Sequence, residues 1–165
     1  MNVMVTGGAG YIGSHAVKRL VEAGHRVLAV DNLFRGHGQA VHPQAAFEKV
    51  ELAETAALAS LLREHAIDCV MHFAALAYVG ESVSEPLRYY DNNTAGAISL
   101  LKAMDAAGCR RLVFSSTCAV YGEPERTPIV ETMPREPISP YGWSKWCVER
   151  VLEDYRAAEA RFAFV

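Results

Sequence analysis

Tyr141 and Lys145 are two residues of this sequence that could carry out acid–base chemistry together. They lie four positions apart in the stretch Tyr-Gly-Trp-Ser-Lys, and this spacing places both side chains on one face of a helix, one turn apart. A tyrosine has a free pKa of about 10, so it acts as a base near neutral pH only where a nearby cation favours the phenolate. The alternative is an ordinary surface pair, because a chain with seven tyrosines gives such a spacing by chance quite often.

Three small hydroxyl residues, Ser115, Ser116 and Thr117, lie at the end of an apolar run that begins at Arg111. If this run is a strand of an open α/β sheet, ligands bind just beyond its carboxyl end. Thr117 would then place a hydroxyl between a substrate and Tyr141. A cluster of hydroxyl residues after a strand is otherwise an ordinary turn.

The first thirty-one residues contain a glycine pattern between two apolar runs. Gly7, Gly10 and Gly13 follow a short run and open a helix-period segment, and a second run over 27–30 ends on Asp31. This order of strand, glycine turn, helix, strand and acid predicts a dinucleotide-binding βαβ unit. Gly7 allows a sharp turn, Gly10 lets a pyrophosphate approach the backbone, and Gly13 lets the helix pack close to the sheet. The N–H groups at the start of the helix would face the phosphates.

Asp31 indicates which dinucleotide is bound. A carboxylate at the tip of the second strand accepts hydrogen bonds from ribose hydroxyls and repels a 2′-phosphate, so NAD is favoured over NADP. Arg35 and His37 follow closely and would weaken this preference if they faced the ribose. We interpret them as exposed loop cations.

Strand and helix patterns alternate along the rest of the chain, which predicts an α/β fold with a doubly wound parallel sheet. The expected strands after the first two are 47–52, 69–75, 111–115 and a final one over 161–165. The expected helices are 54–65, a long one over 87–107 that ends at Gly108, and 141–160. Five prolines lie between the glycine at 122 and the last helix, and such a proline-rich connection is usually functional.

Composition excludes several other classes of protein. The chain has 165 residues and a net charge of −3, which argues against nucleic acid or an anionic membrane as the main partner. No apolar run approaches the roughly twenty residues of a membrane span. Four scattered cysteines without a C-x-x-C pair suggest a reducing, cytoplasmic location. Six histidines show no metal-ligand spacing, so no metal site is expected.

Six motifs together resemble the UDP-glucose 4-epimerase family, within the extended short-chain dehydrogenase/reductase superfamily. They are T-G-G-A-G-Y-I-G-S at 6–14, D-N-L at 31–33, H-F-A-A-L-A-Y-V-G-E-S at 72–82, Y-Y-D-N-N at 89–93, S-S-T-C-A-V-Y-G at 115–122 and P-Y-G-W-S-K at 140–145. The resemblance covers the whole chain. It implies a Rossmann fold and 4-epimerisation of a UDP-hexose, UDP-galactose or UDP-glucose, through a transient 4-keto sugar, with NAD as a bound and regenerated cofactor.

The resemblance also assigns roles to residues. Tyr141 would take the proton of the sugar 4-hydroxyl, Thr117 would hydrogen-bond the same oxygen, and Lys145 would hold the nicotinamide ribose. Besides these three, the expected NAD contacts are Gly7, Gly10, Tyr11, Ile12, Gly13, Asp31, Asn32, Leu33, Phe34, Arg35, Gly36, Glu51, Leu52, Phe73, Ala74, Ala75, Leu76, Ala77 and Asn92. The family forms dimers through two helices, which would correspond to about 87–107 and 141–160 here.

Three departures from the family pattern are visible. Glu51 stands where the family usually has an aspartate that contacts adenine, and Ala77 stands where a lysine is often found. The family also has a second, smaller domain that binds the UDP-sugar, and this chain ends as its sixth strand begins. Residues 1–165 are therefore expected to be an NAD-binding Rossmann domain, truncated before the substrate domain.

Two other interpretations compete with a UDP-hexose epimerase. The chain could act on another UDP-sugar, such as UDP-arabinose, UDP-xylose or UDP-glucuronate, or it could be a non-catalytic NAD-binding module or half-enzyme. A sugar-nucleotide 4,6-dehydratase is rejected, because Cys118-Ala119 replaces the acid pair that eliminates water.

Overall fold

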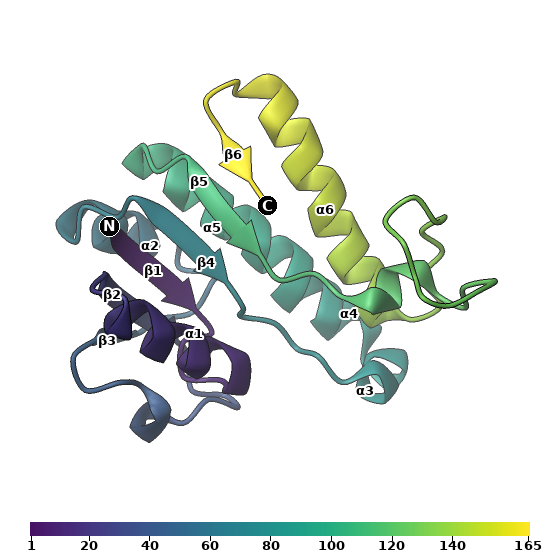
Figure 1. Cartoon of the computed structure of the whole chain (residues 1–165), viewed down its shortest axis with the longest axis horizontal. Coiled ribbons are helices and arrows are strands. Elements are labelled where there is room, and N and C mark those ends of the chain that lie inside the picture. Colours follow the sequence, from purple (N-terminus) through teal and green to yellow (C-terminus); the bar gives the residue numbers. More distant parts are fainter.

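The apolar runs of the sequence pair as six parallel strands in one sheet. The structure is a computed structural model that describes residues 1–165. The strands are β1 (Asn2–Thr6), β2 (Arg26–Asp31), β3 (Ala46–Lys49), β4 (Cys69–His72), β5 (Arg111–Phe114) and β6 (Ala163–Phe164), in the order β3-β2-β1-β4-β5-β6. The chain thus winds outward from β1 in one direction, then returns and continues from β4 in the other (Figure 1). This is the Rossmann strand order, and it confirms the predicted fold class.

Helices cover both faces of the sheet. They are α1 (Tyr11–Glu22), α2 (Thr55–Glu64), α3 (Val79–Ser84), α4 (Pro86–Tyr89), α5 (Gly96–Ala107) and α6 (Pro140–Ala158), with 3₁₀ turns η1 (Gly38–Ala40) and η3 (Cys118–Tyr121). Side chains of α1 pack with alternate residues of β1 and β2 in a small core that includes Val5 and Val17. The intervening strand residues, such as Met4, face the larger core formed with α2, α5 and α6. Strand residues alternate between two cores because successive side chains point to opposite faces.

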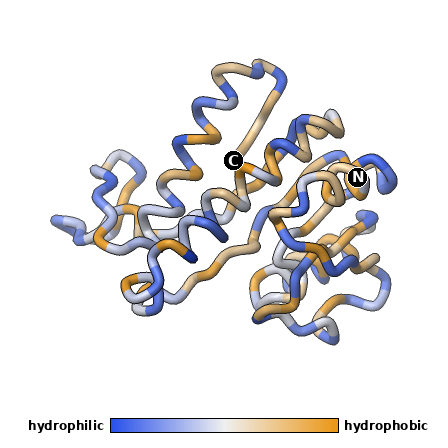
Figure 2. Tube along the Cα trace, turned by 180° about the vertical axis from the view of Figure 1, so that it is seen from behind, coloured by the Kyte–Doolittle hydropathy of each residue, from blue (hydrophilic) through white to orange (hydrophobic).

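Hydropathy follows this layering. Figure 2 shows hydrophobic residues gathered along the central strands, whereas α6 alternates between hydrophobic and hydrophilic positions. Such alternation is typical of a helix with one face on the core and the other in solvent. No helix of the structure combines the length and apolarity that crossing a membrane requires.

The strand register aligns the carboxyl ends of β1, β2, β4 and β5 along one edge of the sheet. Thr6 of β1 pairs with Val30 of β2 and His72 of β4, and His72 pairs with Phe114 of β5. The residues that follow these positions therefore emerge side by side along one edge of the sheet. Since the sheet reverses its winding between β1 and β4, this edge contains the topological switch point at which ligands bind in such folds.

Several elements are shorter or less regular than the sequence-based prediction. β3 ends at Lys49 instead of Leu52, and β6 covers only Ala163–Phe164 of the predicted 161–165. β4 ends at His72 instead of Ala75, because the chain turns away from the sheet after Phe73 donates a last backbone hydrogen bond to Thr6. The long helix predicted over 87–107 is interrupted by a π-helical segment, η2 (Tyr90–Ala95), between α4 and α5. Its predicted end is confirmed, since Gly108 terminates α5 with a left-handed backbone (φ 75°).

Candidate active site

The turn between β1 and α1 is built from glycines that tolerate no side chain. Gly7 has a φ of +69°, and a Cβ atom there would lie 2.6 Å from the backbone nitrogen of Ala74. A Cβ on Gly13 would lie 2.0 Å from the carbonyl oxygen of Gly7. Only glycine therefore allows the first turn of α1 to pack against the end of β1 and the loop after β4.

The start of α1 is left open to a ligand. Gly10 precedes the helix, and no side chain caps the N–H groups of the first turn. These groups have no partner within a helix, and they lie at the positive end of its dipole. Tyr11 and Ile12, the first two helical residues, are exposed. The helix start can therefore bind an anionic group such as a phosphate.

Asp31 is held rigidly at the end of β2. Its side chain is 8% exposed, and its two carboxylate oxygens accept hydrogen bonds from the backbone N–H groups of Ala9 (3.1 Å) and Leu33 (2.8 Å). Gly36 passes so close that a Cβ there would lie 2.7 Å from the carboxylate. Each oxygen retains a lone pair for a further donor, so the carboxylate can accept bonds from ribose hydroxyls.

A cavity of about 380 Å³ joins these features. It is lined by all of the NAD-contacting residues expected from Gly7 to Asn92 except Leu33, and additionally by Thr6, Val30, Val50 and Tyr78. Leu33 instead uses its N–H to hold Asp31 and adopts a positive φ of 61°. Glycine surfaces, free helix N–H groups and a carboxylate acceptor in one cavity fit a dinucleotide.

Glu51 lies in the wall of this cavity and is tied to its neighbours. Its carboxylate accepts a hydrogen bond from the side-chain amide of Asn32 (3.0 Å), and its backbone N–H donates to Glu54 (2.9 Å). The longer carboxylate that replaces the expected aspartate thus still faces the cavity, where an adenine can reach it.

Lys145 is a buried cation at the end of β5. Its side chain is 3% exposed, its ammonium donates a hydrogen bond to the carbonyl oxygen of Ser115 (2.7 Å), and it lies 4.6 Å from the centre of the Phe114 ring. Burial lowers the pKa of Lys145 to about 8, because desolvation disfavours the charged form. An ammonium fixed in this way can hold a ribose hydroxyl and stabilise a neighbouring phenolate.

Tyr141 and Thr117 are brought to the same strand end by tight packing between α6 and η3. Ser139 caps α6 by accepting a hydrogen bond from the N–H of Gly142 (3.1 Å), and a Cβ on Gly142 would lie 2.7 Å from the carbonyl oxygen of Ala119. Thr117 immediately precedes η3 and caps it, because its hydroxyl accepts a hydrogen bond from the N–H of Ala119 (3.2 Å). Thr117, Tyr141 and Lys145 lie outside the lining of the cavity, on elements that meet at the end of β5.

Asn93 links the cavity to α6. Its side-chain amide accepts from the N–H of Leu76 (2.8 Å) and donates to the carbonyl oxygen of Leu76 (3.0 Å) and the hydroxyl of Ser144 (3.0 Å). Ser144 in turn donates to the carbonyl oxygen of Tyr141 (2.7 Å). The sequence pointed to Asn92 and missed Asn93, although the Asn-Asn pair inside a helical segment was a visible signal.

His72 makes the fold sensitive to acid. It is almost fully buried, its Nδ1 lies 2.6 Å from the hydroxyl oxygen of Thr6, and burial and the charge of Lys145 lower its pKa to about 3. At pH values between this value and the ordinary pKa of about 6.5, the unfolded chain binds more protons than the folded one, so the free energy of unfolding falls as the pH falls through this window.

The acid sensitivity caused by His72 can be measured. Between pH 7 and pH 4, we expect the free energy of unfolding of the wild type to fall by about 3 kcal/mol more than that of His72→Gln. Urea unfolding of both proteins at the two pH values measures this difference, and equal losses would contradict it.

The chain is similar to known proteins in both sequence and structure. Residues 3–165 match the model of the NAD dependent epimerase/dehydratase family. The chain is 51% identical over 152 residues to a UDP-glucose 4-epimerase of Lactobacillus helveticus, covering 92% of this chain and 46% of that protein. It is 49% identical over 163 residues to a probable UDP-arabinose 4-epimerase of Oryza sativa subsp. japonica, and this alignment covers 93% of this chain and 40% of that protein.

A solved structure of a UDP-glucose 4-epimerase is also similar to this chain. The UDP-glucose 4-epimerase of Stenotrophomonas maltophila, with bound NAD and formylated UDP-arabinopyranose, superposes with a TM-score of 0.96 at 43% identity. The alignment covers 99% of this chain and 51% of that one. The chain thus spans about half the length of the relatives that it matches.

Proposed function

Because the chain belongs to the NAD-dependent epimerase/dehydratase family, we propose that it binds NAD and carries the acid–base residues for 4-epimerisation of a UDP-hexose, UDP-galactose or UDP-glucose. NAD bound in this cavity would supply reversible hydride transfer at C4 of the sugar. The start of α1 holds the diphosphate, Asp31 holds the adenosine ribose, and Glu51 faces the adenine. The fit of the cavity to a dinucleotide supports this part of the proposal.

Three residues at the end of β5 and the start of α6 would handle the proton. Tyr141 accepts the proton of the 4-hydroxyl, Thr117 hydrogen-bonds the same oxygen, and Lys145 holds the nicotinamide ribose and favours the phenolate of Tyr141. The observation that carries the proposal is the buried ammonium of Lys145, one helical turn after Tyr141. Burying a cation is costly, so its place at the ligand-binding edge of the sheet is best explained by chemistry at that edge.

Conversion of UDP-galactose to UDP-glucose by the 165-residue chain tests the proposal. We expect product to form and NAD to be released when the protein is denatured. Release of NAD without product would favour the second candidate, a cofactor-binding half-enzyme, which is supported by the coverage of about half of each relative. Absence of both product and NAD would contradict both candidates.

A UDP-pentose is the alternative substrate class. UDP-arabinose 4-epimerases match this chain at 49% identity, close to the 51% of a UDP-glucose 4-epimerase. Parallel assays with UDP-galactose and UDP-arabinose separate the two classes, and faster turnover of the pentose would overturn the hexose assignment.

We also propose that the chain forms a homodimer through the face shared by α4, α5 and α6. Leu87 of α4 is 83% exposed and Trp143 of α6 is 43% exposed, and apolar side chains exposed on these helices support an interface with a second copy. Light scattering distinguishes a dimer from a monomer of 18.0 kDa.

We further propose a reducing, cytoplasmic location for the chain, which its four free cysteines support.

A further inference from the structure

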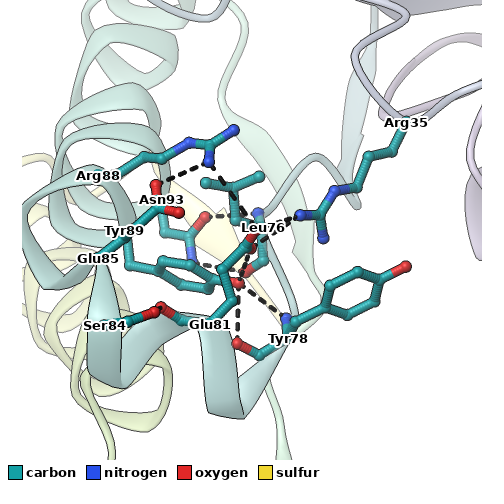
Figure 3. A network of polar contacts seen from close by, with 9 residues as sticks. All are labelled: Arg35, Leu76, Tyr78, Glu81, Ser84, Glu85, Arg88, Tyr89 and Asn93. Atoms are coloured by element: carbon teal, nitrogen blue, oxygen red, sulfur yellow. Dashed lines mark hydrogen bonds and ion pairs between the residues drawn. The ribbon is translucent and has the colours of Figure 1, made fainter.

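The loop after β2 is tied to α3 by one arginine. Figure 3 shows Arg35 extending from this loop towards Glu81 and Tyr78. One of its terminal nitrogens lies 2.7 and 2.8 Å from the two carboxylate oxygens of Glu81. The guanidinium carbon also lies 3.9 Å from the centre of the Tyr78 ring. The cation therefore has an ionic partner and an aromatic partner, both from the opposite segment.

A further contact joins the same loop to α4. The ring of Phe34, also in the loop after β2, has the guanidinium of Arg88 of α4 4.8 Å from its centre and that of Arg35 at 5.4 Å. Arg88 lies 3.8 Å from Glu81 and donates to Glu85 at 2.8 Å. We call Phe34, Arg35, Tyr78, Glu81 and Arg88 the clasp.

The clasp rests on a buried anchor. Tyr89 is fully buried, and its hydroxyl lies 2.6 Å from the carboxylate of Glu81 and 2.8 Å from the carbonyl oxygen of Tyr78, while it accepts a bond from the N–H of Tyr78. Burial and the bond to Glu81 raise the pKa of Tyr89 to about 12, so the hydroxyl stays protonated. The bond from Tyr89 and the charge of Arg35 lower the pKa of Glu81, so its carboxylate stays charged. The Glu81 end of the Arg35–Glu81 pair is therefore fixed by the buried Tyr89.

The clasp lies across the cofactor cavity. Phe34 and Arg35 line the cavity from the wall that follows β2, and Tyr78 lines it from the wall that follows β4. Since Arg35 bonds to one wall from the other, separating the walls requires breaking its contacts with Glu81 and Tyr78.

We propose that the clasp retains bound dinucleotide by holding the two walls of the cavity together, with Arg35 as its positioning residue. This inference rests on the proposed function, in which NAD is regenerated in each catalytic cycle and never needs to leave. An enzyme of that kind gains from slow release of its cofactor, whereas a dehydrogenase that exchanges NAD with solvent does not.

The rate of NAD exchange tests the clasp. The 165-residue chain is loaded with isotopically labelled NAD and diluted into excess unlabelled NAD, and the label still bound is measured over time. We expect Arg35→Gln and Glu81→Gln each to release NAD about fivefold faster or more, since each loses a paired charge and Arg35→Gln also loses its aromatic contact. Because both act through one pair, the double variant should be no faster than the faster single variant.

Two further variants serve as controls. Glu22→Gln removes a surface ion pair of α1, in which Arg19 and Glu22 lie 3.1 Å apart, outside the cavity, and should leave the release rate unchanged. Arg35→Lys keeps the charge and should restore part of the retention. Arg35→Gln leaves the Glu81–Tyr89 bond in place, so the cofactor-free variant should remain folded and unfold cooperatively in urea.

The outcomes separate the two proposals. If the wild type holds no NAD, the proposed function fails and the clasp fails with it. If the wild type holds NAD and the Arg35 and Glu81 variants release it at the wild-type rate, the clasp alone is overturned. It is also overturned if Glu22→Gln accelerates release equally, or if the effects of Arg35→Gln and Glu81→Gln multiply in the double variant.

Discussion

Replacing Tyr141 by phenylalanine is expected to lower turnover of UDP-galactose by about a thousandfold, the usual range for loss of a positioned acid–base group. The substitution removes only the hydroxyl oxygen. The ring keeps its edge-on contact with Tyr89, whose ring centre lies 6.4 Å away, and the helix cap at Ser139 is untouched. The fold and the cofactor cavity should therefore remain intact.

Turnover and NAD content are measured on the same Tyr141→Phe preparation. NAD released on denaturation should equal that of the wild type, since the residues that line the cavity are all unchanged. Tyr155→Phe is the matched control, because Tyr155 lies on the same helix with its hydroxyl 2.9 Å from Asp105, away from the site. Wild-type turnover in Tyr141→Phe would remove Tyr141 from the proposed mechanism.

Gly13→Ala should disrupt the cofactor site from within. The added methyl group would lie 2.0 Å from the carbonyl oxygen of Gly7 and 3.0 Å from the Cα of Gly8. Both are backbone atoms, so α1 must move away from the turn. Overpacking of this kind costs about 1–3 kcal/mol, and we expect NAD binding to weaken by about ten- to a hundredfold.

Titration of NAD into the two proteins, followed by urea unfolding, measures both effects of Gly13→Ala. Gly38→Ala is the matched control, because nothing lies within 4 Å of a Cβ at that position. It should bind NAD as the wild type does. Unchanged binding by Gly13→Ala would mean that the turn is more adaptable than its packing indicates.

The fold was predictable from sequence because its signals are local. Apolar runs, helical spacing and terminal glycines such as Gly108 depend on neighbouring residues, and the parallel sheet that they predicted is confirmed. The predicted end of β4 at residue 75 was wrong, because the apolar residues after His72 line the cavity instead of pairing in the sheet. An apolar run looks the same in both roles. The π-helical turn of η2 was also missed, since helical spacing carries no signal for one inserted residue.

Residue spacing alone predicted the candidate site only where its residues lie close together in the sequence, and the wider set around the cavity came from the family resemblance. The four-residue spacing of Tyr141 and Lys145 predicted a shared helix, which the structure confirms, and their catalytic roles stay predictions. The pairing of Arg35 with Glu81 was missed because 46 positions separate them. Contacts of this kind depend on how β2 and α3 are arranged in the folded chain. Tyr78 was also missed as a cavity residue, although it directly follows the predicted cavity residue Ala77.

The bridge formed by Asn93 has a thermodynamic consequence. One amide is bonded to both Leu76 and Ser144, so hydrogen bonds connect the cavity wall directly to the first turns of α6, and we expect the two segments to become ordered together. A dinucleotide that orders this wall therefore also orders the turn that carries Tyr141. Linkage is reciprocal, so a sugar nucleotide that engages Tyr141 should tighten the binding of the dinucleotide by the same factor. The two ligands would then be heterotropic effectors of each other, coupled through one side chain that touches neither.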